Sequence, residues 1–166
     1  MIYKFKGKLL KLVTKKIRLP NGYRLSLELI EHPGAALIVP FLNSNTLIFI
    51  KQYRPAVGGY LYELPAGTLD PKETPLACAR REIIEETGYA AGTMTPLAKI
   101  YPVPGYSTEI IYIFKAQNLK IKTRHHEPDE VISLCPLTKS QVKKLFQNKK
   151  IRDAKTICAL AFCGWV

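Results

Sequence analysis

The stretch GTLDPKETPLACARREIIEETGY, residues 67–89, decides the fold of this chain and much of its chemistry. If residues 74–87 form a helix, Glu82, Glu85 and Glu86 fall at positions i, i+3 and i+4 and share one face. Three crowded carboxylates repel one another unless a cation neutralises them, and oxygen ligands of this kind suit Mg²⁺ or Mn²⁺. The stretch therefore predicts a divalent-metal site on a helix.

The same stretch carries signals for both ends of that helix. Thr74 can cap the first turn, Pro75 suits the position that follows, and Gly88 can end the helix. The face opposite the glutamates is apolar, so we expect it to pack against a sheet while the glutamates point away from that sheet. The apolar residues concerned are Leu76, Ile83 and Ile84.

Apolar runs on both sides of this helix predict strands. They cover residues 9–18, 24–30, 35–41, 46–52 and 60–64 before the helix, and 97–101, 110–116 and 131–134 after it. Asn21-Gly22 is a strong turn signal between the first two runs. Two further helices are expected at the C-terminal end, over residues 138–147 and 153–163.

This order of elements predicts an α/β (α+β) fold with helices on both sides of a mixed sheet. The first two strands precede it as a small N-terminal antiparallel sheet. We therefore expect residues 1–30 to form an N-terminal extension and residues 31–166 to form the main domain.

The chain of 166 residues has a formal net charge of +12, and eight basic residues precede its first acidic residue, Glu28. Such a charge attracts polyanions, or it reflects a solvated basic surface. No aromatic and basic binding module accompanies it, so the second interpretation is favoured and nucleic acid is not an expected partner. A positive field would still attract a phosphorylated substrate.

The composition also bears on the compartment. The chain has no run of eighteen apolar residues, and its basic N-terminus lacks the continuous apolar core of a secretion signal. The four cysteines form no C-x-x-C pair, which favours buried free thiols in a reducing compartment. They are Cys78, Cys135, Cys158 and Cys163. We expect a cytoplasmic protein that does not contact a membrane.

The spacing within residues 67–89 resembles the signature of the Nudix hydrolases, G-x5-E-x7-R-E-U-x-E-E-x-G-U, where U is a bulky apolar residue. Every fixed position matches, and Tyr89 is the one loose fit because an aliphatic residue is more usual there. The resemblance implies an α/β/α sandwich and hydrolysis of a nucleoside diphosphate linked to another group.

Segments outside this signature resemble the ADP-ribose pyrophosphatase branch of the family. They are Gln52-Tyr53-Arg54, Glu63-Leu64-Pro65-Ala66-Gly67 and Asp153-Ala154-Lys155-Thr156. Pro104 lies fifteen residues after Tyr89, a distance that marks the branch's preference for ADP-ribose. Some of these flanking segments also occur in GDP-mannose hydrolases.

The resemblance implies that Glu82 and Glu86 are the main ligands of Mg²⁺, with Mn²⁺ as the alternative ion. Glu85 would share a second ion, and the carbonyl group of Ala66 would complete the site. Glu73 and Arg81 would orient these ligands without reacting. Gly67 would let the loop turn back against the start of the helix, at a position that tolerates little side-chain bulk.

The general base usually comes from a downstream acidic loop in this family, here within residues 125–130. Glu130 is the first candidate because it precedes an apolar pair, and Glu127 is the second. Glu85, within the signature itself, is a further carboxylate that could accept the proton.

Other residues are expected to bind the substrate. Arg54 can pair with a phosphate through its guanidinium, or it is an ordinary surface arginine. Glu63 can bind the nucleotide or support the metal, or it is a carboxylate on an edge strand. Pro104, Gly105 and Glu109 belong to a loop that would line the site, although a plain turn before residues 110–116 explains them as well.

These features together predict a metal-dependent hydrolase that converts ADP-ribose to AMP and ribose 5-phosphate. One alternative substrate is GDP-mannose or another nucleotide sugar. A different class of function is an RNA-directed protein, either a 5′-end pyrophosphohydrolase or a non-catalytic binder. The resemblance also implies a homodimer in which the N-terminal strands of one subunit cover the adenine bound by the other.

Overall fold

The computed structural model describes residues 2–7, 9–123 and 131–166 of the chain. Within them, three strands precede the main domain: β1 (Ile2–Lys6), β2 (Lys11–Arg18) and β3 (Arg24–Glu31). The main domain begins with β4 (Ala35–Asn43), β5 (Thr46–Arg54), β6 (Gly59–Glu63) and β7 (Ala66–Thr68). It continues with α1 (Pro75–Thr87), β8 (Tyr89–Ile100), β9 (Ile111–Ile121), β10 (Ile132–Thr138), α2 (Lys139–Gln147) and α3 (Ala154–Phe162).

The main sheet is mixed, as expected from the sequence. Its strands follow the order β10-β5-β4-β9-β8, with β6 paired to β5 and β7 paired to β4. The β4 and β9 strands run parallel, whereas the other paired strands of this sheet are antiparallel. The short strand β7 therefore lies beside β4 directly before the chain turns into α1.

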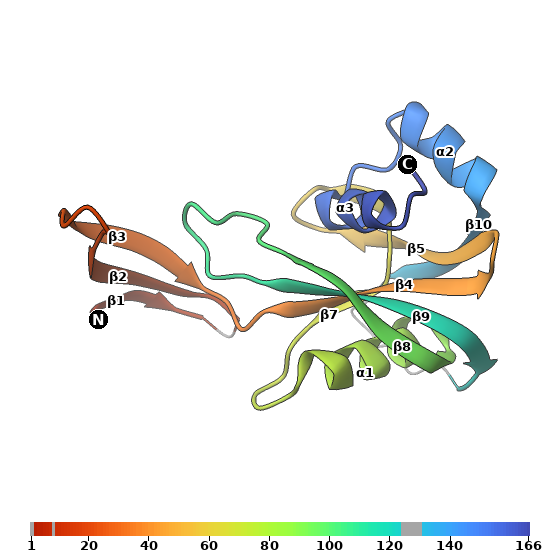
Figure 1. Cartoon of the computed structure of the whole chain (residues 1–166), viewed down its shortest axis with the longest axis horizontal. Coiled ribbons are helices and arrows are strands. Elements are labelled where there is room, and N and C mark those ends of the chain that lie inside the picture. Colours follow the sequence, from red (N-terminus) through yellow and green to blue (C-terminus); the bar gives the residue numbers. More distant parts are fainter. Residues whose placement is uncertain (1, 8, 124–130) are drawn as a thin grey trace.

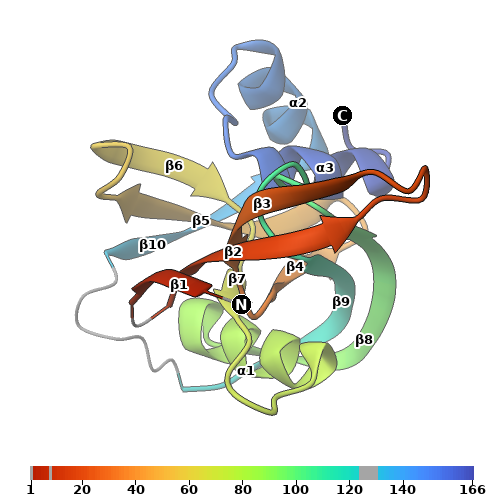
Figure 2. The same cartoon turned by 90° about the vertical axis from the view of Figure 1, so that its left-hand side faces the viewer.

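Alternate residues of β4 face the two sides of the sheet, because side chains in a strand point to opposite faces. Leu37 and Val39 pack in a core with residues of α2 and α3, including Val142 and Leu160. Ala36 and Ile38 pack in a second core against α1. Figures 1 and 2 show α1 on one side of the sheet and α2 with α3 on the other. The predicted α/β/α sandwich is thus confirmed.

The N-terminal strands form a separate antiparallel sheet in the order β1-β2-β3, which projects from one end of the main domain (Figure 1). Ile30 at the end of β3 exchanges backbone hydrogen bonds with Tyr106 and Thr108 of the loop between β8 and β9. Gly34 has a φ of 101°, and a Cβ atom there would lie 3.2 Å from the carbonyl oxygen of Ile110. A glycine is therefore needed where the chain passes from this sheet into β4.

The predicted helix ends are confirmed. Thr74 accepts a hydrogen bond from the Ala77 N–H group, Pro75 opens α1, and Gly88 ends it in a left-handed conformation. Thr138 and Asp153 cap α2 and α3 in the same way. None of the helices in the described parts of the chain is long and apolar enough to span a membrane.

Three strands differ from the expectation. The strand predicted for residues 97–101 is the end of β8, which begins at Tyr89 and pairs with β9 along its length apart from an irregularity near Pro96. Gly92 and Pro96 weaken the sequence signal, but pairing with β9 overrides that weakness. The strand β7 has three residues, too few for a periodic pattern to be visible. The strand β1 was not predicted either.

Candidate active site

The two acidic residues Glu82 and Glu86 of α1 face the short strand β7. Their exposed fractions are only 8% and 2%, and the Ala66 N–H group donates a hydrogen bond to Glu86 Oε2 at 2.9 Å. The expectation that the glutamates point away from the sheet was therefore wrong for this pair. They lie on the inner side of α1 because β7 brings polar backbone groups there, and Leu76 is exposed instead.

Gly67 makes this close approach of β7 and α1 possible. A Cβ atom at Gly67 would lie 1.8 Å from Oε1 of Glu82 and 2.5 Å from its Oε2. The carboxylate of Glu82 thus occupies the space that any side chain at this position would need. The glycine at the start of the signature is required by close packing against the acidic side chain.

Arg81 gathers three carboxylates around one guanidinium. Its Nε and Nη2 atoms donate to the two oxygens of Glu73 at 3.0 and 2.9 Å. Its Nη1 atom donates to Glu82 at 2.6 Å and to Glu85 at 2.9 Å. The hydrogen bonds from Arg81 hold the pKa of Glu73 below its ordinary value, and those from Glu73 raise the pKa of Arg81. Glu73 and Arg81 are therefore both ionised at neutral pH.

The donor set suits a hard divalent cation. Glu82 and Glu86 supply oxygen atoms from α1, and backbone groups of β7 lie beside them. In the described part of the chain, no three side chains of histidine, cysteine, aspartate or glutamate converge in a metal-binding geometry. The guanidinium of Arg81 instead provides the positive charge between Glu82 and Glu85. The position thus already attracts a cation, and its oxygen-only chemistry fits Mg²⁺ or Mn²⁺.

Cys78 lies against the same loop, where its thiol contacts backbone carbonyl groups. Its thiol is within 3.5 Å of the carbonyl oxygen of Gly67 and within 3.6 Å of that of Thr68. Burial raises the pKa of Cys78 to about 12, so the thiol stays protonated and is a poor nucleophile. All four cysteines are free, but only Cys78 is fully buried, so the prediction of buried thiols was correct for one of them.

Glu63 and Arg54 form a second charged group on the other side of β7. The Glu63 side chain is 1% exposed, and Arg54 donates to both of its oxygens at 2.8 Å. Lys155 of α3 also donates to Glu63, and it bonds Asp153 at 2.9 Å. Burial raises the pKa of Glu63, but the hydrogen bonds and charges of Arg54 and Lys155 outweigh it, and the pKa lies below its ordinary value.

These contacts change how both residues are interpreted. Glu63 does end an edge strand, since β6 pairs with β5 alone among the described strands, but its side chain is buried and ion-paired instead of solvent-exposed. Arg54 uses two of its nitrogen atoms to bind Glu63, so it is not an ordinary surface arginine. Those two nitrogen atoms are also already hydrogen-bonded before any phosphate binds. The part that Lys155 plays was missed, because 92 positions separate it from Glu63 and only the fold brings them together.

The loop between β8 and β9 contacts the N-terminal sheet. Pro104 and Gly105 are exposed, and the Tyr106 carbonyl group accepts a hydrogen bond from the Ile30 N–H group at 2.8 Å. Glu109 Oε1 lies 3.9 Å from Nδ1 of His32. The loop is thus more than a plain turn, since it joins the main domain to the extension.

A match to a family model covers residues 31–160, and the family is described as the NUDIX domain. The chain belongs to the Nudix family. It is 33% identical to the ADP-ribose pyrophosphatase of Bacillus subtilis (strain 168), across 95% of this chain and 86% of that protein. It is 34% identical to the methanol dehydrogenase activator of Bacillus methanolicus, with the same coverage.

Two further similarities complete the comparison of this Nudix protein. The GDP-mannose pyrophosphatase of Escherichia coli O139:H28 is 35% identical over 138 residues, which is 78% of this chain and 72% of that protein. The crystal structure of an ADP compounds hydrolase superposes with a TM-score of 0.82 at 24% identity, covering 98% of this chain and 88% of the other. The resemblance seen in the sequence is thereby confirmed for the family and its fold.

The remaining candidates for the general base, Glu127 and Glu130, lie outside the described residues, so their assignment stays a prediction. Glu85 lies within them, and its Oε2 accepts a hydrogen bond from Arg81 at 2.9 Å. Its part as a base also stays a prediction.

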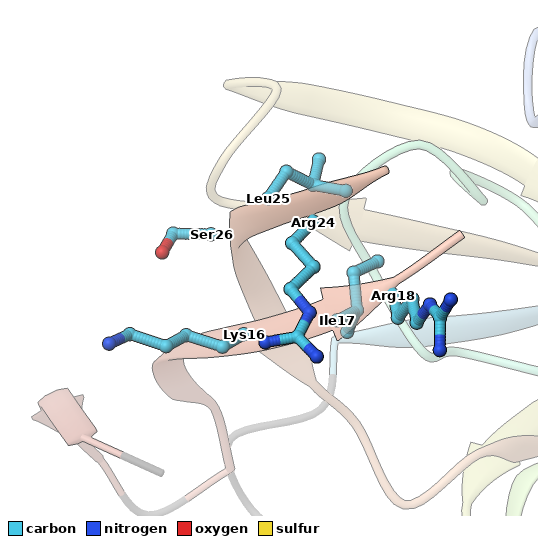
Figure 3. Close-up of a pocket in the computed structure, with 6 residues that line it drawn as sticks. All are labelled: Lys16, Ile17, Arg18, Arg24, Leu25 and Ser26. Atoms are coloured by element: carbon cyan, nitrogen blue, oxygen red, sulfur yellow. The ribbon is translucent and has the colours of Figure 1, made fainter. Parts of the chain in front are cut away.

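A hollow of about 380 Å³ lies away from this acidic site, on the hairpin of β2 and β3. Figure 3 shows its lining, which contains basic side chains and no carboxylate: Lys16, Ile17, Arg18, Arg24, Leu25 and Ser26. Arg18 and Arg24 are direct cross-strand partners, an arrangement that like charges disfavour unless an anion is near. The hairpin therefore contributes a positive field to this Nudix protein.

Proposed function

We propose that this Nudix protein hydrolyses the diphosphate bond of ADP-ribose, giving AMP and ribose 5-phosphate. The observation that carries the proposal is the pair of buried glutamates, Glu82 and Glu86, on the side of α1 that faces the backbone of Ala66. Two carboxylates so placed offer oxygen ligands to a hard divalent cation, and a diphosphate substrate brings divalent cations to such a site.

Different residues would bind the metal ion and orient its ligands in this reaction. Glu82, Glu86 and the carbonyl group of Ala66 would hold the working ion, which we take to be Mg²⁺ with Mn²⁺ as a substitute, and Glu85 would share a second ion. A bound divalent cation neutralises the phosphate oxygens and lowers the pKa of a bound water. Glu73 and Arg81 keep the ligands oriented, and Gly67 leaves room for Glu82.

Proton transfer would then fall to the acidic loop that follows β9. We assign Glu130 as the general base, with Glu127 as the alternative, since Glu85 is already bound to Arg81. Water attacks one phosphorus atom of the substrate, and the bond from that phosphorus to the bridging oxygen breaks. AMP and ribose 5-phosphate are released, each with one of the two phosphates.

The choice of ADP-ribose is supported by the similarity to an ADP-ribose pyrophosphatase over nearly the whole of both chains. Pro104, fifteen residues after Tyr89, supports the same substrate. GDP-mannose is the second candidate, because relatives that hydrolyse it are 35% identical over a shorter part of the chain. RNA is the third candidate substrate, because the basic hairpin of β2 and β3 could attract its phosphates.

A panel of substrates tests the proposal directly. We expect ADP-ribose to be hydrolysed with the highest kcat/KM in the presence of Mg²⁺, and no substrate to be hydrolysed after treatment with a chelator. A higher kcat/KM for GDP-mannose would change the proposed substrate, but hydrolysis of a diphosphate bond would remain the proposed reaction. Comparable rates with triphosphorylated RNA and ADP-ribose would overturn the proposal.

We also infer that the protein acts as a homodimer in the cytoplasm. On β3, Leu25, Leu27 and Leu29 alternate with exposed residues and are themselves only half-buried, which leaves an apolar face on a sheet that projects from the domain. The free thiols of all four cysteines support a reducing compartment. Light scattering of the wild type and Leu27→Glu tests the dimer, and a monomeric wild type would exclude it.

A further inference from the structure

The segment Glu63–Ala66 is held from three sides, and each contact comes from a different element. On the α3 side, the Leu64 N–H group donates to the hydroxyl group of Thr156 at 2.9 Å. At β4, the Ile38 N–H group donates to the Pro65 carbonyl at 2.8 Å. On the α1 side, the Ala66 N–H group donates to Glu86 at 2.9 Å. The position of Ala66 therefore depends on all three.

Lys155 of α3 forms ion pairs with Glu63 and with Asp153 beside this segment. It donates to Glu63, whose carboxylate is 1% exposed, and to Asp153, which also accepts the Thr156 N–H group at the start of α3. A buried carboxylate is stable only while it is fully paired and hydrogen-bonded. Without Lys155, one hydrogen bond to Glu63 and one to Asp153 are lost, and Glu63 keeps only Arg54 among the partners described here.

Two positions separate Leu64 from Ala66, so a movement of Glu63 is transmitted along a short, extended stretch to the proposed metal ligands. We propose that Lys155 is a positioning residue, which acts through Glu63 to hold the Ala66 carbonyl group and Glu86 in the geometry that binds the divalent cation. This inference deepens the proposed function and rests on its metal site. Lys155 itself contacts neither the metal nor the substrate.

Metal binding without substrate is the first measurement. We expect Lys155→Met to weaken Mn²⁺ binding about tenfold, which is the size of effect seen when a group that supports a metal ligand is removed. Electron paramagnetic resonance or calorimetry measures this binding. Lys155→Arg keeps the charge and should stay close to the wild type. Lys150→Met is the matched control, because Lys150 is exposed and precedes α3 in the chain. Equal Mn²⁺ binding by Lys155→Met and Lys150→Met would overturn the inference.

A double mutant asks whether Lys155 acts through Glu63. If it does, Glu63→Gln/Lys155→Met should bind Mn²⁺ no more weakly than the weaker of the two single mutants, since both changes break the same link. Losses that multiply would show that Lys155 acts on its own and would contradict the proposal. If Lys155→Met does not fold, Glu63→Gln alone weakens the same link, and unchanged Mn²⁺ binding in that variant would also contradict the proposal.

Kinetics separate this inference from the proposed function. With ADP-ribose, Lys155→Met should require about tenfold more Mg²⁺ for half-maximal rate while kcat at saturating Mg²⁺ falls less. A wild type that binds Mn²⁺ but does not hydrolyse ADP-ribose would refute the proposed substrate and leave the role of Lys155 standing. A wild type that hydrolyses ADP-ribose, with Lys155→Met unchanged in metal requirement, would refute only the role of Lys155.

Discussion

The main domain contains two groups of charged residues, one on each side of β7, and they differ in the numbers of acidic and basic side chains. Beneath β7, one arginine of α1, Arg81, binds three carboxylates. On the α3 side, Arg54 and Lys155 face two carboxylates, Glu63 and Asp153. The first group has more acids than bases, whereas the second has equal numbers of each.

This difference indicates which group binds a ligand and which supports the fold. A balanced and hydrogen-bonded network satisfies its own charges, so it has no need of an external ion. A group with excess acid gains from binding a divalent cation. The α1 group is therefore the reactive site in our proposal, and the α3 group holds the segment between them in place.

The largest effect should come from the reactive group. Glu86→Gln removes a proposed metal ligand but keeps an oxygen that accepts the Ala66 N–H group, so we expect kcat with ADP-ribose to fall about a thousandfold, equivalent to several kcal/mol of lost metal stabilisation. The thermal unfolding temperature should change little. Glu31→Gln, which breaks an ion pair with Lys15 on the N-terminal sheet, is the control. Near-wild-type turnover at saturating Mg²⁺ would show that the metal site is elsewhere.

The general base comes next. Glu130→Gln should lower kcat about a hundredfold or more with little change in KM, because a base acts in the transition state and not in substrate binding. Glu127→Gln and Glu85→Gln are measured beside it. A collapse of substrate affinity with an unchanged kcat would make Glu130 a binding residue, and a larger loss in Glu127→Gln would move the assignment there.

Gly67→Ala should have a smaller effect on the same site. The new methyl group would meet the carboxylate of Glu82 at 1.8 Å, so Glu82 must move and metal affinity should fall about tenfold to a hundredfold. Gly59→Ala is the control, because no atom lies within 4 Å of a Cβ at that position. Mn²⁺ binding and kcat are measured for both, and equal values would mean that Glu82 is not held where the structure places it.

The smallest effect concerns the balanced group and depends on pH. The pKa of Glu63 is lowered from 4.5 in the folded state, so its ionised form stabilises the fold above the unfolded pKa. That contribution is lost as the pH falls below about 4.5 and through the folded pKa. Urea unfolding from pH 7 to pH 3.5 should show a smaller loss of stability in Glu63→Gln than in the wild type. Identical pH dependences would contradict the ion pairs of Glu63.

Local signals predicted most of the elements. The α1 helix was predicted with both ends because its cap, its proline and its final glycine all lie within one short stretch. The strands β2 to β5 were predicted because their apolar patterns are strong. The first half of β8 was missed, since Gly92 and Pro96 interrupt its pattern and its stability comes from pairing with β9.

The sequence by itself determined the family, the set of acidic residues on α1 and the need for a glycine at position 67, because these depend on spacing along one helix and its leading loop. Only the tertiary structure decided that Glu82 and Glu86 are buried against β7, and that Lys155 reaches Glu63 across 92 positions. Burial and long-range charge pairing depend on which elements pack together. Spacing along the chain carries no information about such contacts until the sheet has brought β7 between α1 and α3.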